Sequence, residues 1–122
     1  MQHADSGSID WPKFLDRFGG RQDFVAKLVA AALSGHQNAP ALLRSQAEQS
    51  DWAALAATAH SIKGLAGNLM SAGVQDLARQ TELAARAGDP VATELAATLA
   101  QAMEGMLNDL QSWLAAYSGG AA

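Results

Sequence analysis

The sequence predicts an all-α protein, an antiparallel up-and-down bundle of four helices with a short N-terminal helix packed on one end. The 122-residue chain is rich in Ala, Leu and Gln and poor in β-branched residues, which favours helix over sheet. Its apolar residues recur at steps of three and four between short stretches of Gly, Pro and Ser. We expect one domain over residues 9–117, with flexible tails over 1–8 and 118–122.

The first half of the chain predicts a short helix and then a long one. Ser8 or Asp10 can cap the short helix, and Gly19-Gly20 ends it. A second helix starts near Arg21, but residues 34–40 interrupt its apolar pattern. Because Pro40 lacks a backbone N–H, this helix is either broken or kinked there, and the sequence leaves both possibilities open.

The second half predicts three further helices. One should run from Asp51 to about Met70, with Ser50 as its N-cap. After a turn at 71–73 comes a helix that ends at Gly88, where Gly-Asp-Pro supplies a stop, an N-cap and a first helical residue. The last helix should run from Pro90 to Tyr117. Its apolar residues follow helical spacing: Leu95, Leu99, Met103, Met106, Leu110, Trp113 and Tyr117.

Composition excludes several classes of function. The net charge of −4 weighs against nucleic-acid binding, which needs a basic surface. The absence of cysteine excludes disulfides, thiolate zinc sites and cysteine nucleophiles. No apolar run approaches the roughly 18 residues of a membrane span, and the N-terminus lacks a signal-peptide pattern. We therefore expect a cytoplasmic protein without direct membrane contact.

The segment AHSIKGLAG, residues 59–67, places a histidine, a lysine and two glycines inside the third long helix. An apolar stripe should face the core there: Trp52, Leu55, Ala59, Ile62, Ala66 and Leu69. Measured from that stripe, His60 lies about 130° away, Lys63 about 70°, Gly64 about 170° and Gly67 about 110°. The spacing predicts that these four residues share one solvent-facing patch.

The chemistry of that patch suits an anionic group carried on nitrogen. An exposed neutral imidazole has a nucleophilic nitrogen and needs no base to expose it. Lys63 adds a positive charge one turn from His60, and Gly64 leaves the ring uncovered for a large donor. The other two histidines, His3 and His36, fall in the tail and in the interrupted segment, so we expect no function of them.

The segment AHSIKGLAGNL resembles the signature of histidine phosphotransfer (HPt) domains of bacterial multistep phosphorelays. The segments DRFGGRQDFVAKLV, SDWAALAATAHSIKG and LARQTELAARAGDP are also similar to that family, and together they cover most of residues 9–90. The long last helix matches in length and pattern only. Many members have Gly two residues after the Asn, where this chain has Met70.

The resemblance implies a four-helix bundle that relays a phosphoryl group between the aspartates of receiver domains in two-component signal transduction. It implies that His60 is the phosphoacceptor, through Nε2, that Lys63 lies near the phosphoryl oxygens, and that Gly64 gives a receiver room to dock. Gly67 and Ala56 are predicted to contact the partner, and for Gly67 a role in helix packing is the alternative.

The resemblance also implies a phosphocarrier rather than an enzyme, without a nucleotide, cofactor or metal site of its own. Mg²⁺ should be supplied by the receiver. The expected partners are receiver domains of response regulators, a hybrid sensor histidine kinase, or both. The chain should be a monomer, either free or as part of a membrane-anchored hybrid kinase.

Two other functions remain open at this point. A helical adaptor could bind receiver domains without transferring phosphate. A hydrolase could use His60 as a general base, but it would need a pocket and an orienting carboxylate. The nearest acidic residues along the predicted helix and beyond it, Asp51 and Asp76, do not lie within a turn of His60.

Overall fold

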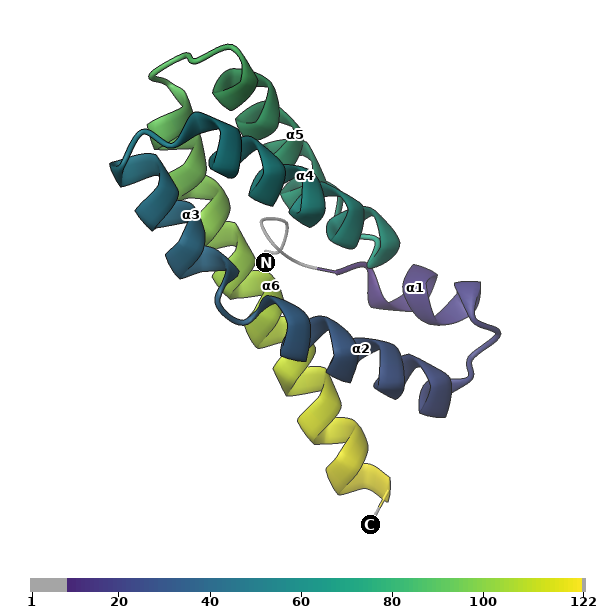
Figure 1. Cartoon of the computed structure of the whole chain (residues 1–122). Helices are drawn as coiled ribbons and strands as arrows, with labels where there is room; N and C mark the ends of the chain where they lie inside the picture. The colour runs from purple at the N-terminus through teal and green to yellow at the C-terminus, as the bar shows by residue number, and fades with distance from the viewer. Residues whose placement is uncertain (1–8, 122) are drawn as a thin grey trace.

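The computed structural model describes residues 9–121, which form helices and, in that range, no strand (Figure 1). The all-α prediction is thereby confirmed for this part of the chain. The tail predicted over residues 1–8 lies outside it, as does residue 122. The helices are α1 (Trp11–Arg17), α2 (Gln22–His36), α3 (Ala39–Glu48), α4 (Trp52–Asn68), α5 (Ala72–Arg86) and α6 (Ala92–Ala121).

Two helices, α2 and α3, replace the single second helix of the sequence prediction. Gln37 and Asn38 between them keep right-handed helical backbone angles, with φ of −59° and −91°. Pro40 has no N–H to donate to the carbonyl of His36, so the hydrogen-bond ladder is interrupted and the chain changes direction (Figure 1). The open question of a break or a kink is therefore answered by two helices that meet at a bend.

The helices α3, α4, α5 and α6 form a closed ring, in which α3 packs on α4, α4 on α5, α5 on α6 and α6 on α3. The α2 helix packs along α6, which runs past the other helices of the ring (Figure 1). The side chains at the centre of this ring are fully buried: Leu43, Leu55, Ile62, Leu99, Met103 and Met106. Burial of these apolar groups is the main term that holds α4 in a fixed orientation.

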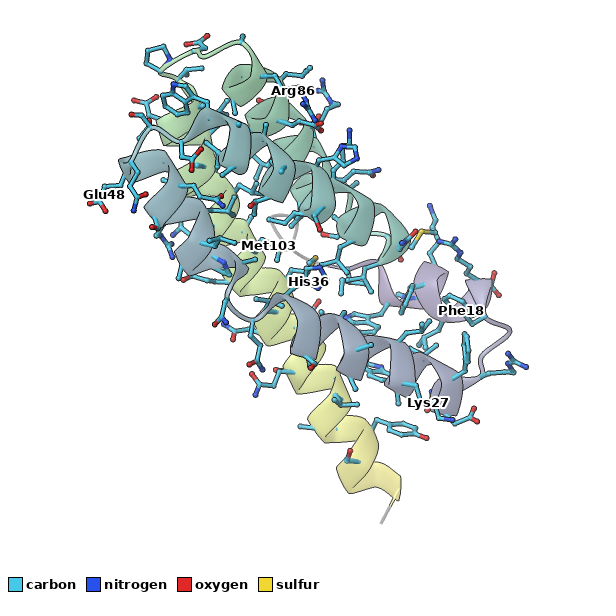
Figure 2. The ribbon with its side chains drawn as sticks, in the orientation of Figure 1. Phe18, Lys27, His36, Glu48, Arg86 and Met103 are labelled. Carbon is cyan, nitrogen blue, oxygen red and sulfur yellow. The ribbon has the colours of Figure 1, made fainter. Side chains whose placement is uncertain are left out.

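The short α1 helix is held by its cap and its aromatic residues. The carboxylate of Asp10 accepts a hydrogen bond from the Lys13 N–H at 3.2 Å, as predicted for an N-cap. Phe14 is buried, and Phe18 lies between α1 and α2 with its ring 5.5 Å from that of Phe24 (Figure 2). Gly19 has a φ of +62°, and so the helix ends where the sequence predicts.

Both ends of α4 differ from the sequence prediction. The N-cap is Asp51, whose carboxylate accepts a hydrogen bond from the Ala54 N–H at 3.3 Å. Ser50, the predicted cap, instead has a left-handed backbone with φ of 53°, because the chain reverses there between α3 and α4. At the other end, Met70 has φ of 59° and the Ser71 N–H donates to the Ala66 carbonyl at 2.9 Å. Gly, which the resemblance described above leads us to expect at this position, adopts that backbone without strain.

The last joint and the start of the last helix lie close to their predicted positions, but the last helix ends later than predicted. Gly88 has φ of +65°, and the Asp89 carboxylate accepts a hydrogen bond from the Val91 N–H at 3.0 Å. The α6 helix begins at Ala92 and continues to Ala121, past the predicted end at Tyr117 and into the predicted tail over 118–122. Helix ends are the part of an element that sequence patterns define least. Among the described residues, no helix is long and apolar enough to cross a membrane.

Candidate functional site

The α4 helix turns its predicted stripe toward the core and His60 toward solvent. Leu55, Ala59, Ile62, Ala66 and Leu69 are all buried, and Trp52 is partly buried. The side chain of His60 is 62% exposed, which agrees with its predicted position on the helical wheel. An imidazole in this position can be reached by a large partner.

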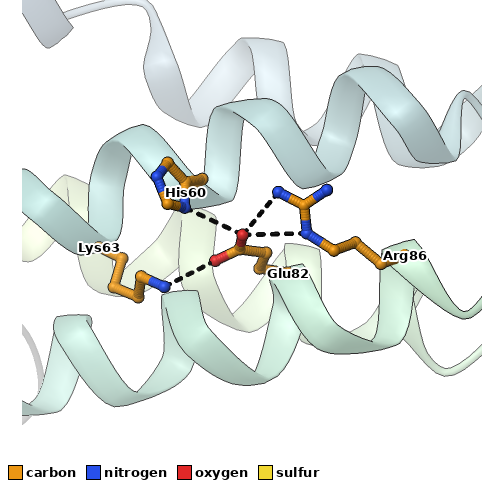
Figure 3. A network of polar contacts seen from close by, with 4 residues as sticks. All are labelled: His60, Lys63, Glu82 and Arg86. Carbon is orange, nitrogen blue, oxygen red and sulfur yellow. Dashed lines mark hydrogen bonds and ion pairs between the residues drawn. The ribbon is translucent and has the colours of Figure 1, made fainter.

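Glu82 on α5 lies directly beside His60 and Lys63 (Figure 3). Its Oε2 atom is 2.9 Å from Nδ1 of His60, and its Oε1 atom is 2.9 Å from Nζ of Lys63. Arg86, one turn further along α5, donates to the same Oε2 from Nη2 at 2.7 Å and from Nε at 3.0 Å. One carboxylate therefore connects three nitrogen-bearing side chains from two helices.

The electrostatics of this cluster keep Glu82 ionised. Hydrogen bonds from Arg86, then from Lys63 and then from His60 lower the pKa of Glu82 to about 2, although burial acts to raise it. The side chain of Glu82 is only 8% exposed, so the carboxylate has little water of its own and depends on these donors. Lys63 and Arg86 remain 33% and 58% exposed and keep access to solvent.

The sequence did not reveal Glu82 or Arg86 as members of the site. The nearest acidic residues considered there were Asp51 and Asp76, and the orienting carboxylate that they could not supply comes instead from α5. A weak signal was present, because Glu82 lies next to the buried Thr81 and would be an unusual charge in that seam without a partner. His60 itself is an exposed side chain, whereas a hydrolase needs a pocket that encloses its substrate.

Gly64 and Gly67 have different surroundings, although both were predicted to face solvent. A Cβ placed on Gly64 meets no other atom within 4 Å, so this residue faces open space. A Cβ on Gly67 would lie 2.8 Å from Nε2 of Gln75 on α5. Gly67 therefore faces α5, and the prediction of a solvent-facing patch is wrong for it.

Ala56 is buried, which argues against its predicted contact with a partner. It is 2% exposed and lines a shallow hollow between α4 and α5 with Ala85 and Arg86. Its position one turn before His60 turns it toward α5, and the close packing of these two helices covers it. Of the five predicted site residues, His60, Lys63 and Gly64 share an accessible face.

His36, the other histidine within the described range, lies apart from this site. Its Nδ1 atom is 3.0 Å from the carbonyl oxygen of Ala32, one turn earlier on α2. This contact is local to the end of the helix. Between residues 9 and 121, no group of three or more His, Asp or Glu side chains is arranged to hold a metal ion.

Comparison with protein families identified one match. The family model described as Hpt domain matches residues 23–113, a segment that includes α3, α4 and α5 in full and most of α2 and α6. Comparison with curated proteins and with solved structures gave no match. Hpt domains act as phosphocarriers in the histidine phosphotransfer of phosphorelays, and they interact with receiver domains and kinases.

Proposed function

The chain belongs to the Hpt domain family, and on that premise we propose that it relays a phosphoryl group between receiver-domain aspartates through His60. The observation that supports this most directly is the exposed ring of His60 with the ammonium group of Lys63 on the same side of α4. Both side chains contact Glu82, so their relative positions are set before a partner arrives. Preorganised geometry of this kind supplies much of the catalysis in phosphoryl transfer.

His60, Lys63 and Gly64 each have a distinct role in this proposal. Nε2 of His60 accepts the phosphoryl group, since Nδ1 already contacts Glu82. Lys63 offsets the negative charge of the phosphoryl oxygens. Gly64 leaves the surface beside the ring open, so that the receiver can bring its aspartyl phosphate to Nε2. Arg86 reaches the same carboxylate from α5 and adds a second positive charge to this face.

The partner in this proposal is a receiver domain of a response regulator or of a hybrid sensor histidine kinase. We propose that the receiver supplies Mg²⁺ and the acidic pocket, while this chain acts as a monomeric phosphocarrier. We also propose that the ring of α3 to α6 is the antiparallel four-helix bundle of the family, with α4 and α5 carrying the site.

A phosphotransfer assay tests the function. The purified chain is mixed with a panel of phosphorylated receiver domains and Mg²⁺, and acid-labile, base-stable phosphate is followed on the chain. We expect the native chain to accept phosphate and His60→Gln to accept none. Since His60 is an exposed side chain, that variant should keep the helicity and melting temperature of the native chain. His36→Gln is the matched control and should accept phosphate normally.

Three results would contradict the proposal in different ways. Receivers that bind the chain but transfer no phosphate would support the adaptor function instead. A panel in which no receiver binds would exclude this partner class. Phosphate on the His60→Gln variant would place the acceptor at another residue.

A further inference from the structure

A hollow lies between α1, α2 and the C-terminal half of α4, apart from the contacts of the His60 cluster. Its volume is about 390 Å³, within the range of about 300 to 1,000 Å³ that is typical of small-molecule sites. Leu65 and Asn68 line it from α4, whereas His60, Lys63 and Glu82 do not. The hollow is therefore a separate feature of the surface.

The hollow follows from the bend at Pro40. The α3 helix packs on α4, but α2, which precedes the bend, packs along α6 and not closely on α4. The α1 helix lies beside the space that this leaves between α2 and α4 (Figure 1). Three buried side chains, those of Phe14, Ala32 and Leu69, line the hollow and give it an apolar floor.

The wall of the hollow is aromatic. The ring of Phe18 lies 5.3 Å from that of Phe14, at 81°, and 5.5 Å from that of Phe24, at 54°. Rings inclined in this way can take a further ring against an edge or a face. Phe24 is 38% exposed, so a ligand that covered its ring would gain free energy from burial of apolar surface. The wall therefore suits a flat aromatic group.

Two arginines lie at this aromatic wall. Arg17 lines the hollow, with its Cζ 5.8 Å from the centre of the Phe18 ring. The Cζ of Arg21 lies 5.2 Å from the centre of the Phe24 ring. Nη1 of Arg17 donates to Sδ of Met70 at 3.9 Å, and a thioether is only a weak acceptor. A carboxylate would be a stronger partner for the guanidinium group.

The charge of these two arginines is not compensated within the described part of the chain. Neither of them forms an ion pair there, whereas Arg44, Arg79 and Arg86 each pair with a carboxylate. The acidic residues within α1 and α2, Asp16 and Asp23, do not line the hollow. Its apolar interior and its cationic mouth are therefore complementary to an anion with an apolar body.

We propose that this hollow is a binding site for a small aromatic carboxylate. The ring of the ligand lies against the phenylalanine wall, and its carboxylate pairs with Arg17. Arg21 adds a second positive charge beside the same wall. This site goes beyond the proposed phosphotransfer and does not depend on it.

Naphthoate is a suitable probe, and naphthalenemethanol, which has the same rings but no charge, is its matched control. Each is titrated into the full chain, and backbone amide NMR shifts report both the affinity and the location of binding. We expect naphthoate to bind with a Kd of about 1 mM or lower and to shift amides of α1, α2 and residues 65–69. The neutral analogue should bind about fivefold more weakly, because it cannot form the charge-assisted pair.

Four variants test the charge and the space separately. Arg17→Gln should weaken naphthoate binding about fivefold, while Lys13→Gln, which also removes a positive charge from α1 but lies outside the hollow, should not weaken it. Ala31→Leu should weaken binding about tenfold, because Ala31 lines the hollow and the longer side chain occupies it. Ala30→Leu, on an exposed neighbour that does not line the hollow, is its control. Thermal melts show that the compared proteins are folded.

Several results would overturn this site. These are amide shifts confined to other parts of the chain, equal affinities for naphthoate and naphthalenemethanol, or equal affinities in Arg17→Gln and Lys13→Gln. If naphthoate does not bind and Ala31→Leu slows transfer from a receiver relative to Ala30→Leu, the hollow belongs to a docked receiver instead. If naphthoate does not bind and Ala31→Leu abolishes self-association of the chain, it belongs to a second copy.

The same experiment distinguishes this site from the proposed function. His60→Gln should bind naphthoate as the native chain does, because His60 does not line the hollow. Failure of every receiver to transfer phosphate would overturn the proposed function and leave the naphthoate affinities unchanged.

Discussion

Gly64 lowers the stability of the α4 helix in which it lies. A glycine inside a helix costs about 1 kcal/mol relative to alanine. No packing constraint requires glycine there, since a Cβ would meet nothing within 4 Å. The neighbouring Gly67 is different, because the side chain of Gln75 occupies the space that its Cβ would need. The open surface beside His60 is therefore what distinguishes Gly64, and a substitution there tests docking separately from folding.

We expect Gly64→Leu to slow phosphotransfer from a receiver by about tenfold or more, because the new side chain would stand between the receiver and the ring. Its melting temperature should stay the same or rise, since Leu is a better helix former than Gly. Circular dichroism and the transfer assay measure the two effects. Phosphorylation by phosphoramidate is the control and should change little, because the small donor needs no docking surface. An unchanged rate with the receiver would contradict the docking role of Gly64.

From the sequence, only the site residues on α4 could be predicted, and those on α5 could not. The period of 3.6 residues placed His60 and Gly64 on the outer face of α4 correctly. It could not identify Glu82, because the contact depends on how α5 is rotated and shifted against α4. The same limit explains Gly67, which lies near the edge of the exposed face, where a neighbouring helix decides between solvent and contact.

At the scale of the elements, the joint between α3 and α4 contains backbone strain. Ser50 has φ of 53°, an angle that costs an L-residue about 1 kcal/mol or more. Its side chain is exposed, and Asp51 caps the helix instead. Ser50 therefore does not make the capping hydrogen bond predicted for it, and that bond does not offset the strain of its backbone.

We expect Ser50→Gly to raise the free energy of unfolding by about 0.5 to 1 kcal/mol, since Gly adopts a left-handed backbone without a steric penalty but loses more entropy on folding. Denaturant unfolding measures this difference. Ser50→Ala is the matched control, because it removes the hydroxyl but keeps the Cβ, and it should give no gain. A loss of stability in Ser50→Gly would show that the hydroxyl of Ser50 contributes to the joint.

The elements themselves were predictable, while their joints were less so. The composition and the helical spacing of the apolar residues predicted the helices, and the Gly-Gly and Gly-Asp-Pro segments predicted two of the turns. Gly19, Gly20 and Gly88 in these turns all have positive φ. The bend at Pro40 was visible as an interruption, but its form depends on how α2 and α3 each pack on α6. The choice between Ser50 and Asp51 as N-cap was decided by the direction from which the chain enters α4.

At the scale of the whole molecule, the beginning of the described chain is tied to the far half of α6. Oδ2 of Asp109 accepts hydrogen bonds from the Ile9 N–H at 3.3 Å and from Nε1 of Trp11 at 3.0 Å. The ring of Trp11 stacks on Trp113 with centroids 5.1 Å apart. These contacts join residues about 100 positions apart in sequence and hold the start of α1 against the second half of α6. The polar contacts of the His60 cluster on α4 and α5 include neither Asp109 nor Trp11.

This separation predicts that Asp109→Ala will lower stability without changing phosphotransfer. The variant leaves the indole N–H of Trp11 and the backbone N–H of Ile9 without their acceptor, and we expect a loss of about 1 to 2 kcal/mol in the free energy of unfolding. Denaturant unfolding followed by tryptophan fluorescence measures it. Asp109→Asn, which keeps one acceptor oxygen, should lose less.

The rate of phosphate acceptance from a receiver should match that of the native chain in both variants, because neither changes the contacts of Glu82. A slower rate in a folded Asp109→Ala variant would show instead that the α1 end of the molecule takes part in docking.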